Sequence, residues 1–304
     1  MADDPLTIAH LLKQGEVFLK EQGIAAARWE AETLLGHLLG WSRARLYQNL
    51  QEEIGERSRS KFGELLTRRG RRVPLQYILG SQDFMGLAFH VDERVLIPRP
   101  ETELLVERVL FLLQGRNSPR VADLGTGSGA IAISLAVFHP TVEVWAVDLS
   151  AAALDLAREN ARQHQVEDRI CFQQGDWLAP LEKAGVIGQL DGIVSNPPYI
   201  TTQQLNGLDP EVRDHEPRPA LDGGSDGLQF YRALARDGKK FLKKDGFMAL
   251  EIGYDQGEAV VQLLETVGRW KSVNLQQDYA GRDRIVWSAR TGQESSGQEK
   301  DEYA

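Results

Sequence analysis

Apolar residues recur near a 3.6-residue period through the first eighty positions of this 304-residue chain, which is typical of amphipathic helices. One stripe contains Leu6, Ile8, Leu11, Leu12, Val17 and Phe18, and a second contains Trp29, Leu34, Leu35, Leu38, Leu39 and Trp41. A third helix is expected from Arg59 to Arg72, because the residue before Pro74 disfavours helical backbone. Such stripes must be buried against one another, so residues 1–80 are predicted to form a small helical domain.

The period changes near Phe84, where short apolar runs replace the helical stripes. Residues 87–91 and 95–97 are apolar or alternating, and the charged residues 92–94 separate them. This pattern predicts a β-hairpin within residues 81–97 that links the helical domain to the rest of the chain.

From Pro98 to about residue 289, strand patterns alternate with helical ones, which favours a doubly wound, mostly parallel α/β sheet. Five strands are expected at 120–124, 142–147, 169–173, 191–195 and 247–252, with a terminal pair at 273–276 and 284–288. Helices are expected at 130–138, 151–164, 228–242 and 255–267, and Glu101 and Glu103 begin another behind Pro100. Residues 290–304 are rich in Gln, Glu, Ser and Gly and are predicted to be disordered.

Composition narrows the possible partners and the compartment. No basic or apolar leader is visible in the first residues, and no uncharged apolar run approaches the ~18 residues that span a bilayer, so a cytoplasmic protein without membrane contact is expected. Cys171 is the sole cysteine and the six histidines are scattered, so neither a disulfide nor a metal site is expected.

Charge is distributed unevenly between the two predicted domains. Residues 1–100 hold 14 Lys and Arg against 13 Asp and Glu, whereas residues 101–304 hold 21 against 31, a net charge of −10. This acidic part is poorly suited to bind phosphate backbones. The basic cluster Arg68, Arg69, Arg71 and Arg72 is interpreted as a solvated helix face rather than a nucleic-acid contact.

A glycine-rich stretch follows the first predicted strand of the sheet and contains Gly125, Thr126, Gly127, Ser128 and Gly129. Its glycines permit a tight strand-to-helix turn and a close approach of backbone to ligand, and the same letters also satisfy a dinucleotide fingerprint. Asp148 ends the next strand, where it can accept from ribose hydroxyls of either ligand. Asp176 and Trp177 follow the third strand and fit an adenine ring, an interpretation favoured over the alternative that Trp177 is an ordinary core or edge aromatic.

The tetrapeptide Asn196-Pro197-Pro198-Tyr199 follows the strand at 191–195. The Asn196 side-chain oxygen and the Pro197 carbonyl can together accept both N–H bonds of a planar amide or amino group, and the prolines restrict the backbone that holds them. Tyr199 offers a flat face for stacking. Taken alone the tetrapeptide could be only a turn, but its place beyond the carboxyl end of a strand favours a binding site.

These features together resemble the class I S-adenosylmethionine-dependent methyltransferases. More narrowly, residues 97–103 (IPRPETE), 212–217 (VRDHEP) and 220–224 (ALDGG) resemble stretches of the peptide chain release factor glutamine methyltransferases. The resemblance runs from the helical N-terminal domain to about residue 289. It implies a seven-stranded Rossmann-like methyltransferase sheet over residues 98–289, with S-adenosylmethionine as cofactor and S-adenosylhomocysteine as product.

The resemblance also implies an activity, N5-methylation of the glutamine in the Gly-Gly-Gln motif of release factors. Cofactor contacts would come from Gly125, Thr126, Gly127, Ser128, Gly129, Asp148, Asp176, Trp177 and Asn196. Asn196, Pro197, Pro198 and Tyr199 would hold the glutamine amide, with Asn196, Pro197 and Tyr199 serving catalysis. The helical domain would bind the release factor away from the chemistry. A monomer without direct nucleic-acid contact is expected, and His215 is expected to shape its loop rather than act as a base.

Three other functions have to be weighed against this one. A methyltransferase acting on adenine or guanine in nucleic acid can use the same tetrapeptide, but it needs a basic channel that the acidic domain does not suggest. A nicotinamide-dependent dehydrogenase fits the glycine loop but leaves the tetrapeptide unexplained. A non-catalytic binding module would have no reason to keep the complete set of cofactor motifs.

Overall fold

The computed structural model describes residues 7–268, 270 and 272–289, and within these ranges the chain divides into two compact units. The first unit runs up to Ser81 and also includes the segment Asp209–His215. The second contains Gln82–Leu208 and the chain from Glu216 onward. Leu6 of the first predicted stripe and the tail predicted to be disordered, residues 290–304, lie outside the described residues.

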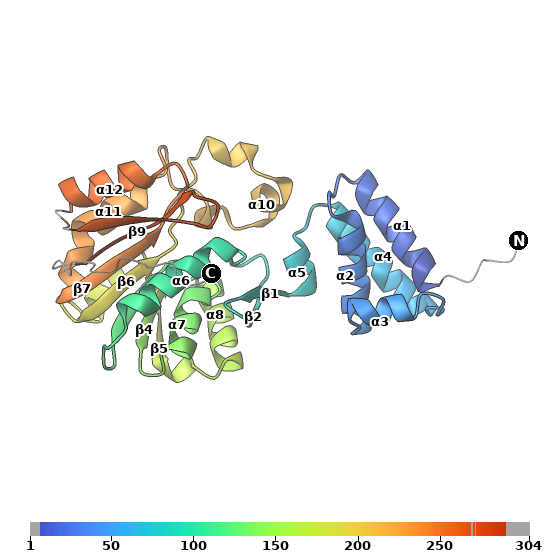
Figure 1. Cartoon of the computed structure of the whole chain (residues 1–304), viewed down its shortest axis with the longest axis horizontal. Helices are drawn as coiled ribbons and strands as arrows, with labels where there is room; N and C mark the ends of the chain where they lie inside the picture. Colours follow the sequence, from blue (N-terminus) through green and yellow to red (C-terminus); the bar gives the residue numbers. More distant parts are fainter. Residues whose placement is uncertain (1–6, 269, 271, 290–304) are drawn as a thin grey trace, which may run out of the picture. The chain divides into compact units, whose positions relative to one another are not determined.

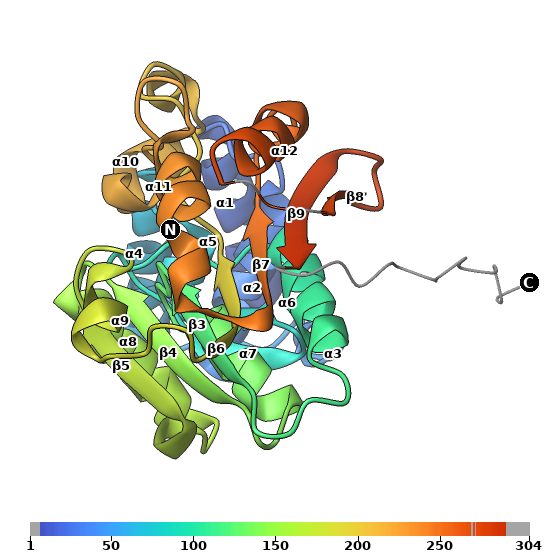
Figure 2. The same ribbon diagram turned by 90° about the vertical axis from the view of Figure 1, so that its left-hand side faces the viewer.

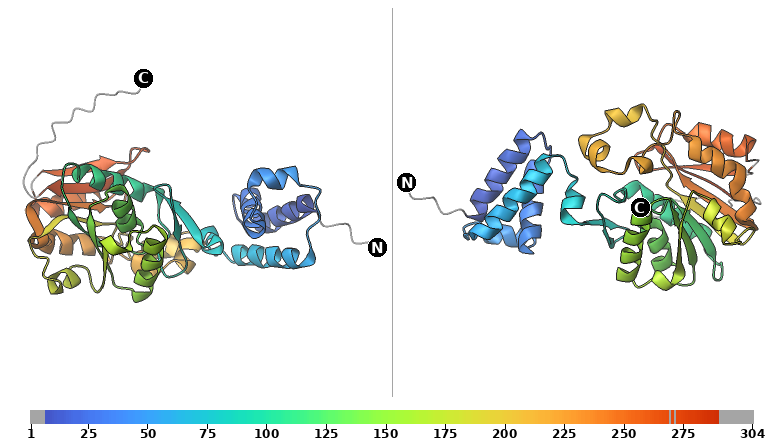
Figure 3. Two further views of the ribbon diagram at one scale, coloured as in Figure 1. Left: turned by 90° about the horizontal axis from the view of Figure 1, so that it is seen from below. Right: turned by 180° about the vertical axis from the view of Figure 1, so that it is seen from behind.

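The first unit is a bundle of helices, and Figure 1 draws α1 to α4 in blue and α5 in teal. Its helices are α1 (Ile8–Glu21), α2 (Ala27–Leu39), α3 (Arg43–Gln48), α4 (Glu56–Gly70) and α5 (Leu75–Leu79). Figure 3 shows α1, α2 and α4 packed beside one another. Their shared core contains Ile8, Leu11, Leu19, Leu34, Leu35, Leu46, Phe62 and Leu66, so the helical pattern is confirmed, while Val17 and Trp29 of the predicted stripes are about half exposed.

Arg69 in this unit does not lie on a solvated helix face. Its side chain is buried and is paired with Glu30 of α2, and its Nη2 lies 2.9 Å from Oε1 of Glu211. Glu211 belongs to α10 (Pro210–His215) and also accepts from Nη2 of Arg72 at 2.7 Å. The interpretation of the basic cluster is therefore wrong for Arg69, because two carboxylates compensate the buried cation and one of them lies far along the chain.

The second unit is built on a seven-stranded sheet, seen from another side in Figure 2. Its strands are β3 (Arg120–Leu124), β4 (Glu143–Asp148), β5 (Ile170–Gln174), β6 (Leu190–Ser195), β7 (Leu242–Glu251), β8 (Val273–Gln277) and β9 (Asp283–Ala289). The strand order is β5-β4-β3-β6-β7-β9-β8, and only the pairings made by β9 are antiparallel. The doubly wound, mostly parallel sheet is confirmed, although β7 begins at Leu242 rather than Phe247.

Helices cover both faces of this sheet. One face packs against α6 (Pro100–Leu112), α7 (Ala130–Phe138) and α8 (Ala151–Gln163), and the other against α9 (Ala179–Lys183), α11 (Gln229–Asp237) and α12 (Gly257–Thr266). Strand order reverses between β3 and β6, so the crevice where ligands bind in such sheets is expected at the carboxyl ends of these two strands. No helix in the described part of the chain is both long and apolar enough to cross a bilayer.

The linking hairpin exists, but its strands differ from those expected. β1 (Ser81–Phe84) pairs with β2 (Leu87–His90), whereas residues 95–97 form no strand, so the expected pairing of 87–91 with 95–97 is wrong. Met85 and Gly86 connect the strands with φ values of 52° and 70°. Two consecutive residues with positive φ suit the right-handed twist of a two-residue hairpin, and the glycine makes this turn accessible.

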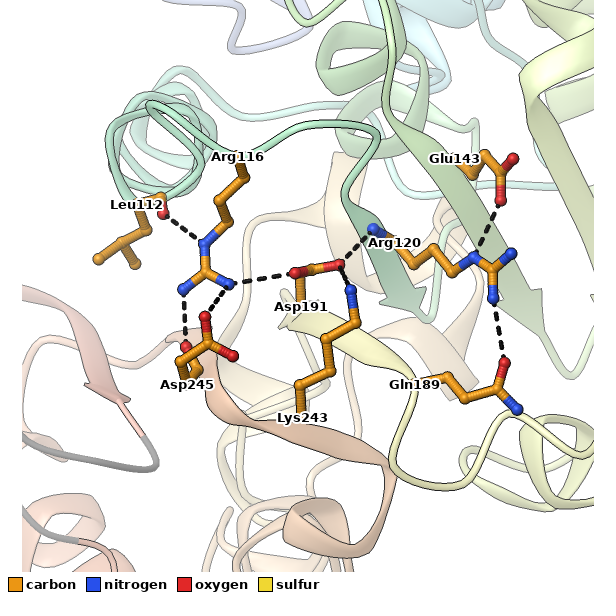
Figure 4. A network of polar contacts seen from close by, with 8 residues as sticks. All are labelled: Leu112, Arg116, Arg120, Glu143, Gln189, Asp191, Lys243 and Asp245. Carbon is orange, nitrogen blue, oxygen red and sulfur yellow. Dashed lines mark hydrogen bonds and ion pairs between the residues drawn. The ribbon is translucent and has the colours of Figure 1, made fainter.

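A network of ion pairs ties the strands together at their amino ends (Figure 4). Asp191, the second residue of β6, accepts from the backbone N–H of Arg120 at 2.8 Å, from Nζ of Lys243 at 2.7 Å and from Nη1 of Arg116 at 3.1 Å. Burial opposes ionisation of Asp191, but Lys243 and the other donors outweigh it and lower the pKa of the carboxyl. Because this network lies at the opposite ends of the strands from the crevice, we assign it to stability rather than to chemistry.

Candidate active site

A cavity of about 870 Å³ lies within the second unit at the carboxyl ends of the parallel strands. Its wall draws residues from the carboxyl ends of four neighbouring strands and from the loops after them, among them Gly125, Asp148, Asp176 and Asn196. A volume of this order is typical of sites for small molecules and cofactors. The crevice expected from the strand order is therefore present, and it contains residues from the glycine loop, from the aspartate that ends β4, from the Asp176-Trp177 pair and from the tetrapeptide.

The glycine loop turns sharply between β3 and α7. Gly125 and Gly127 have φ values of 73° and 55°, a region that side-chain-bearing residues rarely adopt, and both line the cavity. The Gly125 N–H donates to the carbonyl of Val147 at 2.8 Å, which fixes the loop to the neighbouring strand. Backbone rather than side chains thus faces the ligand space at this point.

The remaining residues of the loop are not part of the described cavity wall. Thr126 is buried and donates from its hydroxyl to Oδ2 of Asp123 at 2.6 Å. The carbonyl of buried Ser128 accepts from Nδ2 of Asn160 at 2.9 Å, and Gly129 precedes the first residue of α7. These three predicted cofactor contacts would act by shaping the loop, and direct contact with a ligand remains a prediction.

Asp148 is held at the cavity by two backbone donors. Its Oδ2 accepts from the N–H of Gly127 and its Oδ1 from the N–H of Ser150, both at 2.9 Å. Burial raises the pKa of Asp148, although the Ser150 and Gly127 donors favour the ionised form. Each oxygen keeps acceptor capacity beyond these bonds, so the carboxylate can receive two hydroxyl groups from a ligand.

An aromatic pair forms another part of the cavity wall. The rings of Trp177 and Phe230 lie with centroids 4.3 Å apart at an interplanar angle of 37°, and both residues line the cavity together with Asp176. Phe230 was not predicted from the sequence. A signal was available, because Tyr231 and Leu234 form the buried stripe of α11 and leave Phe230 as an aromatic residue outside that stripe.

The tetrapeptide after β6 reaches the same cavity through two of its four residues. Asn196 and Pro198 line the cavity, whereas Pro197 is buried and Tyr199 packs against the core that α11 and α12 share. Burial, followed by the nearby charge of Glu251, raises the pKa of Tyr199, so its hydroxyl stays neutral. The stacking role expected for Tyr199 remains a prediction.

The ALDGG motif lies directly against the tetrapeptide. The Ile200 N–H donates to the carbonyl of Leu221 at 3.1 Å, and the Gly223 N–H donates to the carbonyl of Ile200 at 2.8 Å. A Cβ atom on Gly223 would lie 2.8 Å from the carbonyl oxygen of Pro198, closer than real Cβ atoms come to such a neighbour. Glycine is therefore required here by the close approach of two backbones.

The two remaining motifs are joined by an ion pair. Nη2 of Arg99 lies 2.7 and 2.8 Å from the two carboxylate oxygens of Glu216, which is almost fully buried. Burial raises the pKa of Glu216, and Arg99 opposes that shift. Pro217, the next residue, lines the cavity, so the pair supports the cavity wall. In the first unit, the His215 ring nitrogen lies 3.2 Å from the carbonyl of Arg71, a contact that suits a structural role.

Comparison with known proteins adds family relationships to this geometry. Residues 10–80 match the family model described as the PrmC N-terminal domain, and residues 100–208 match the methyltransferase small domain. A release factor glutamine methyltransferase of Moorella thermoacetica is 46% identical over 285 residues, which cover 94% of this chain and 99% of that protein. The release factor glutamine methyltransferase of Geobacter sulfurreducens is 41% identical over 92% of this chain and 95% of that protein. The enzyme of the same name from Bacillus cereus is 40% identical over 93% of this chain and 99% of that protein.

Solved structures resemble this chain in fold at much lower identity. The hMettl16 catalytic domain, in a complex with a MAT2A 3'UTR hairpin, matches with a TM-score of 0.56 and 17% identity over 76% of this chain and 83% of that one. At such identity the similarity concerns the fold alone.

Proposed function

The chain belongs to the family of release factor glutamine methyltransferases, and we propose that it transfers a methyl group from S-adenosylmethionine to the side-chain amide nitrogen of the glutamine in the Gly-Gly-Gln motif of peptide chain release factors. The observation that carries the proposal is the meeting of Asn196 with the glycine loop and Asp148 around one cavity. That combination offers acceptors for a planar nitrogen beside a site suited to a nucleoside.

The residues of the cavity suit S-adenosylmethionine in chemistry as well as in volume. Asp148 would accept from the ribose hydroxyls, since its backbone donors leave lone pairs free on both oxygens. Asp176 would accept from the adenine amino group, and Trp177 with Phe230 would provide an apolar wall for the ring. Gly125 would let the backbone approach the rest of the cofactor closely.

The cofactor supplies an electrophilic methyl group on a sulfonium sulfur. Asn196 and the carbonyl of Pro197 would accept the two N–H bonds of the glutamine amide and hold its nitrogen in line for attack, with Pro198 and Tyr199 limiting the movement of these acceptors. The bound cofactor would supply the methyl group to that nitrogen, with loss of the carbon–sulfur bond and release of S-adenosylhomocysteine. The alkylated amide nitrogen is strongly acidic and loses its proton to water, so no side chain has to act as a base.

We further propose that the helical domain recognises the body of the release factor, because a single glutamine amide offers little surface for specificity. A protein with this substrate would work in the cytoplasm, as a monomer that meets its protein substrate directly. The comparison to make is kcat/KM on intact release factor against kcat/KM on a short peptide that contains Gly-Gly-Gln. Equal values for both substrates would remove the recognition role of the helical domain.

Methylation of a nucleic-acid base is the runner-up, and it is not favoured. The similarity to the hMettl16 catalytic domain, whose structure contains a MAT2A 3'UTR hairpin, concerns the fold alone and does not support this function. Residues 101–304 also carry a net charge of −10, which repels the phosphates of a nucleic acid. A nicotinamide-dependent dehydrogenase gives no role to the hydrogen-bond acceptors at Asn196. A non-catalytic module gives no role to the cavity.

Transfer of a labelled methyl group tests the proposal. Purified release factor, RNA and DNA are each incubated with the protein and labelled S-adenosylmethionine, and label is expected in release factor only. Asn196→Ala should lower kcat by roughly 10²-fold, since misplacing a reacting atom by about an ångström has an effect of that size. Asn274→Ala on β8, whose side chain donates to the nearby Ser272 carbonyl outside the cavity, is the matched control. Label in nucleic acid and none in release factor would contradict the proposal.

A further inference from the structure

The Asn196 amide is anchored from behind by a pair of buried side chains to which no role has been given above. Its Nδ2 donates to Oγ1 of Thr102 at 3.1 Å, and the Thr102 hydroxyl lies 2.6 Å from Oε2 of Glu251. Thr102 lies in the first turn of α6 within the IPRPETE motif, and Glu251 is the last residue of β7. Both are almost completely inaccessible to solvent, at 5% and 1% exposure, so water does not compete for these bonds.

While Glu251 is ionised, the number of available protons sets the direction of these hydrogen bonds. A threonine hydroxyl has one proton to donate, and an ionised carboxylate can only accept, so Thr102 donates to Glu251. The hydroxyl oxygen then has only lone pairs left for Asn196, and it must meet the amide nitrogen rather than the amide oxygen. Oδ1 is consequently the amide atom that remains free to accept from a substrate.

We propose that Thr102 and Glu251 are positioning residues that orient the Asn196 amide with its oxygen toward the glutamine N–H bonds of the substrate. The inference rests on the proposed function, since only a substrate that donates N–H bonds needs that orientation. With the amide turned around, Nδ2 would point its own N–H bonds at those of the glutamine, and neither set would find an acceptor. The buried pair prevents this because the turned amide loses its bond to Thr102.

The backbone around the pair is fixed by regular structure. β6 and β7 are neighbouring parallel strands in which Ser195 lies opposite Leu250, so Asn196 and Glu251 each follow that last matched pair. The carbonyl of Glu251 also accepts from the hydroxyl of Tyr231 at 2.9 Å. Three elements, α6, β6 and β7, therefore hold the chain from Asn196 through Thr102 to Glu251 at defined separations.

Protonation of Glu251 would reverse the chain of donors. Burial raises the pKa of Glu251 to about 7, against its bond from Thr102. The other titratable groups facing it are Arg284 on β9, Arg99 and Glu101 at the start of α6, Tyr199 after β6 and Tyr231 on α11. A protonated Glu251 donates its proton to the Thr102 hydroxyl oxygen, so the Thr102 hydroxyl donates to Asn196 instead of to Glu251. This donor favours the Asn196 amide oxygen, Oδ1, as its partner. Activity should therefore fall as the pH drops through the pKa of Glu251 and Oδ1 turns away from the substrate.

The test compares Thr102→Val, which keeps shape but removes the hydroxyl, with Thr102→Ser, which keeps the hydroxyl. We expect Thr102→Val to lower kcat on release factor by roughly 10-fold or more, with the cofactor Kd within about 3-fold of wild type, and Thr102→Ser to restore kcat to within about 3-fold. Thr266→Val on α12, where the hydroxyl donates to the Gln262 carbonyl of the same helix, should leave kcat unchanged. A Thr102→Val enzyme as fast as wild type, or a Thr102→Ser enzyme as slow as Thr102→Val, overturns the proposal.

A second variant keeps the proposal testable if Thr102→Val does not fold. Glu251→Gln has the same shape and cannot titrate, so its kcat should stay level from about pH 6 to pH 8, while the wild-type kcat falls on the acid side of about pH 7. A Glu251→Gln enzyme whose kcat still falls in acid like the wild type overturns the proposal. Wild-type protein that transfers no methyl group to release factor would instead refute the proposed function, so the two failures are distinguishable.

Discussion

Replacing Asp148 by alanine should weaken cofactor binding while leaving the fold intact. In the structure each carboxylate oxygen already accepts one backbone N–H, from Gly127 or Ser150, and retains capacity for one ribose hydroxyl. A hydrogen bond to a charged group contributes about 1.5–3 kcal/mol, and neighbouring bonds to one carboxylate are not additive. We therefore expect a loss of about 2–3 kcal/mol, or roughly 30- to 140-fold in Kd.

Calorimetric titration with S-adenosylmethionine and S-adenosylhomocysteine measures this loss for both ligands. Asp155→Ala is the matched control, because Asp155 lies on the following helix and forms an exposed ion pair with Arg158. Thermal unfolding without ligand checks that Asp148→Ala is folded. A Kd for Asp148→Ala within about 3-fold of wild type, in a folded protein, would remove Asp148 from the cofactor site.

The pH dependence of binding provides an independent check on Asp148. Burial raises the pKa of this carboxyl, and only its ionised form can accept from two hydroxyls with both oxygens. Wild-type affinity should therefore decline as the pH falls through that raised pKa, whereas the affinity of Asp148→Ala should change less over the same range. Parallel pH profiles for the two proteins would contradict this role.

Three further changes test other parts of the structure. Gly223→Ala should lower kcat by roughly 10-fold, because its Cβ would push on the carbonyl of Pro198 at 2.8 Å; an unchanged kcat would argue against that close approach. Asp191→Asn should cost about 1–3 kcal/mol of unfolding free energy at pH 7, measured by chemical denaturation. The pKa of Asp191 is lower in the folded protein than in the unfolded chain, where it is about 3.9. The wild type should therefore be more stable than Asp191→Asn above about pH 3.9, and this stability difference should vanish as the pH falls through the pKa of the folded protein. A stability difference that does not change with pH would contradict the role of the ion network. Arg69→Met should destabilise the helical unit by about 3–5 kcal/mol, because it removes the cation from buried Glu30 and leaves Glu211 with Arg72 alone, and an unchanged unfolding temperature would refute this.

The sequence predicted the sheet well because its strands are short apolar runs with clear breaks between them. It failed where structure depends on partners far apart in the chain. Arg69 reads as one of several exposed arginines until Glu211 is placed beside it, and residues 95–97 read as a strand because they are apolar. The sequence did not predict the turn at Met85 and Gly86, because a bulky residue such as methionine rarely adopts the positive φ that this turn requires.

The candidate site was predicted to a similar degree and for the same reason. Residues at or just beyond strand ends, such as Asp148 and Asn196, could be placed because carboxyl ends of parallel strands meet at one edge. Thr102 and Glu251 could not be connected to them, since Thr102 stood in a helix start and Glu251 in an apolar strand. Phe230 was missed because its place at the cavity depends on how α11 packs, which the alternation of elements does not specify.

Locating the transferred methyl group tests the central claim most directly. Release factor is incubated with the protein and S-adenosylmethionine, digested and analysed by tandem mass spectrometry, beside a release factor whose Gly-Gly-Gln glutamine is replaced by glutamate. We expect one added methyl on the side-chain amide of that glutamine and no transfer to the glutamate form, which lacks the N–H bonds that Asn196 would accept. A methyl group found on a lysine, on a carboxylate or on a nucleic-acid base instead would contradict the account.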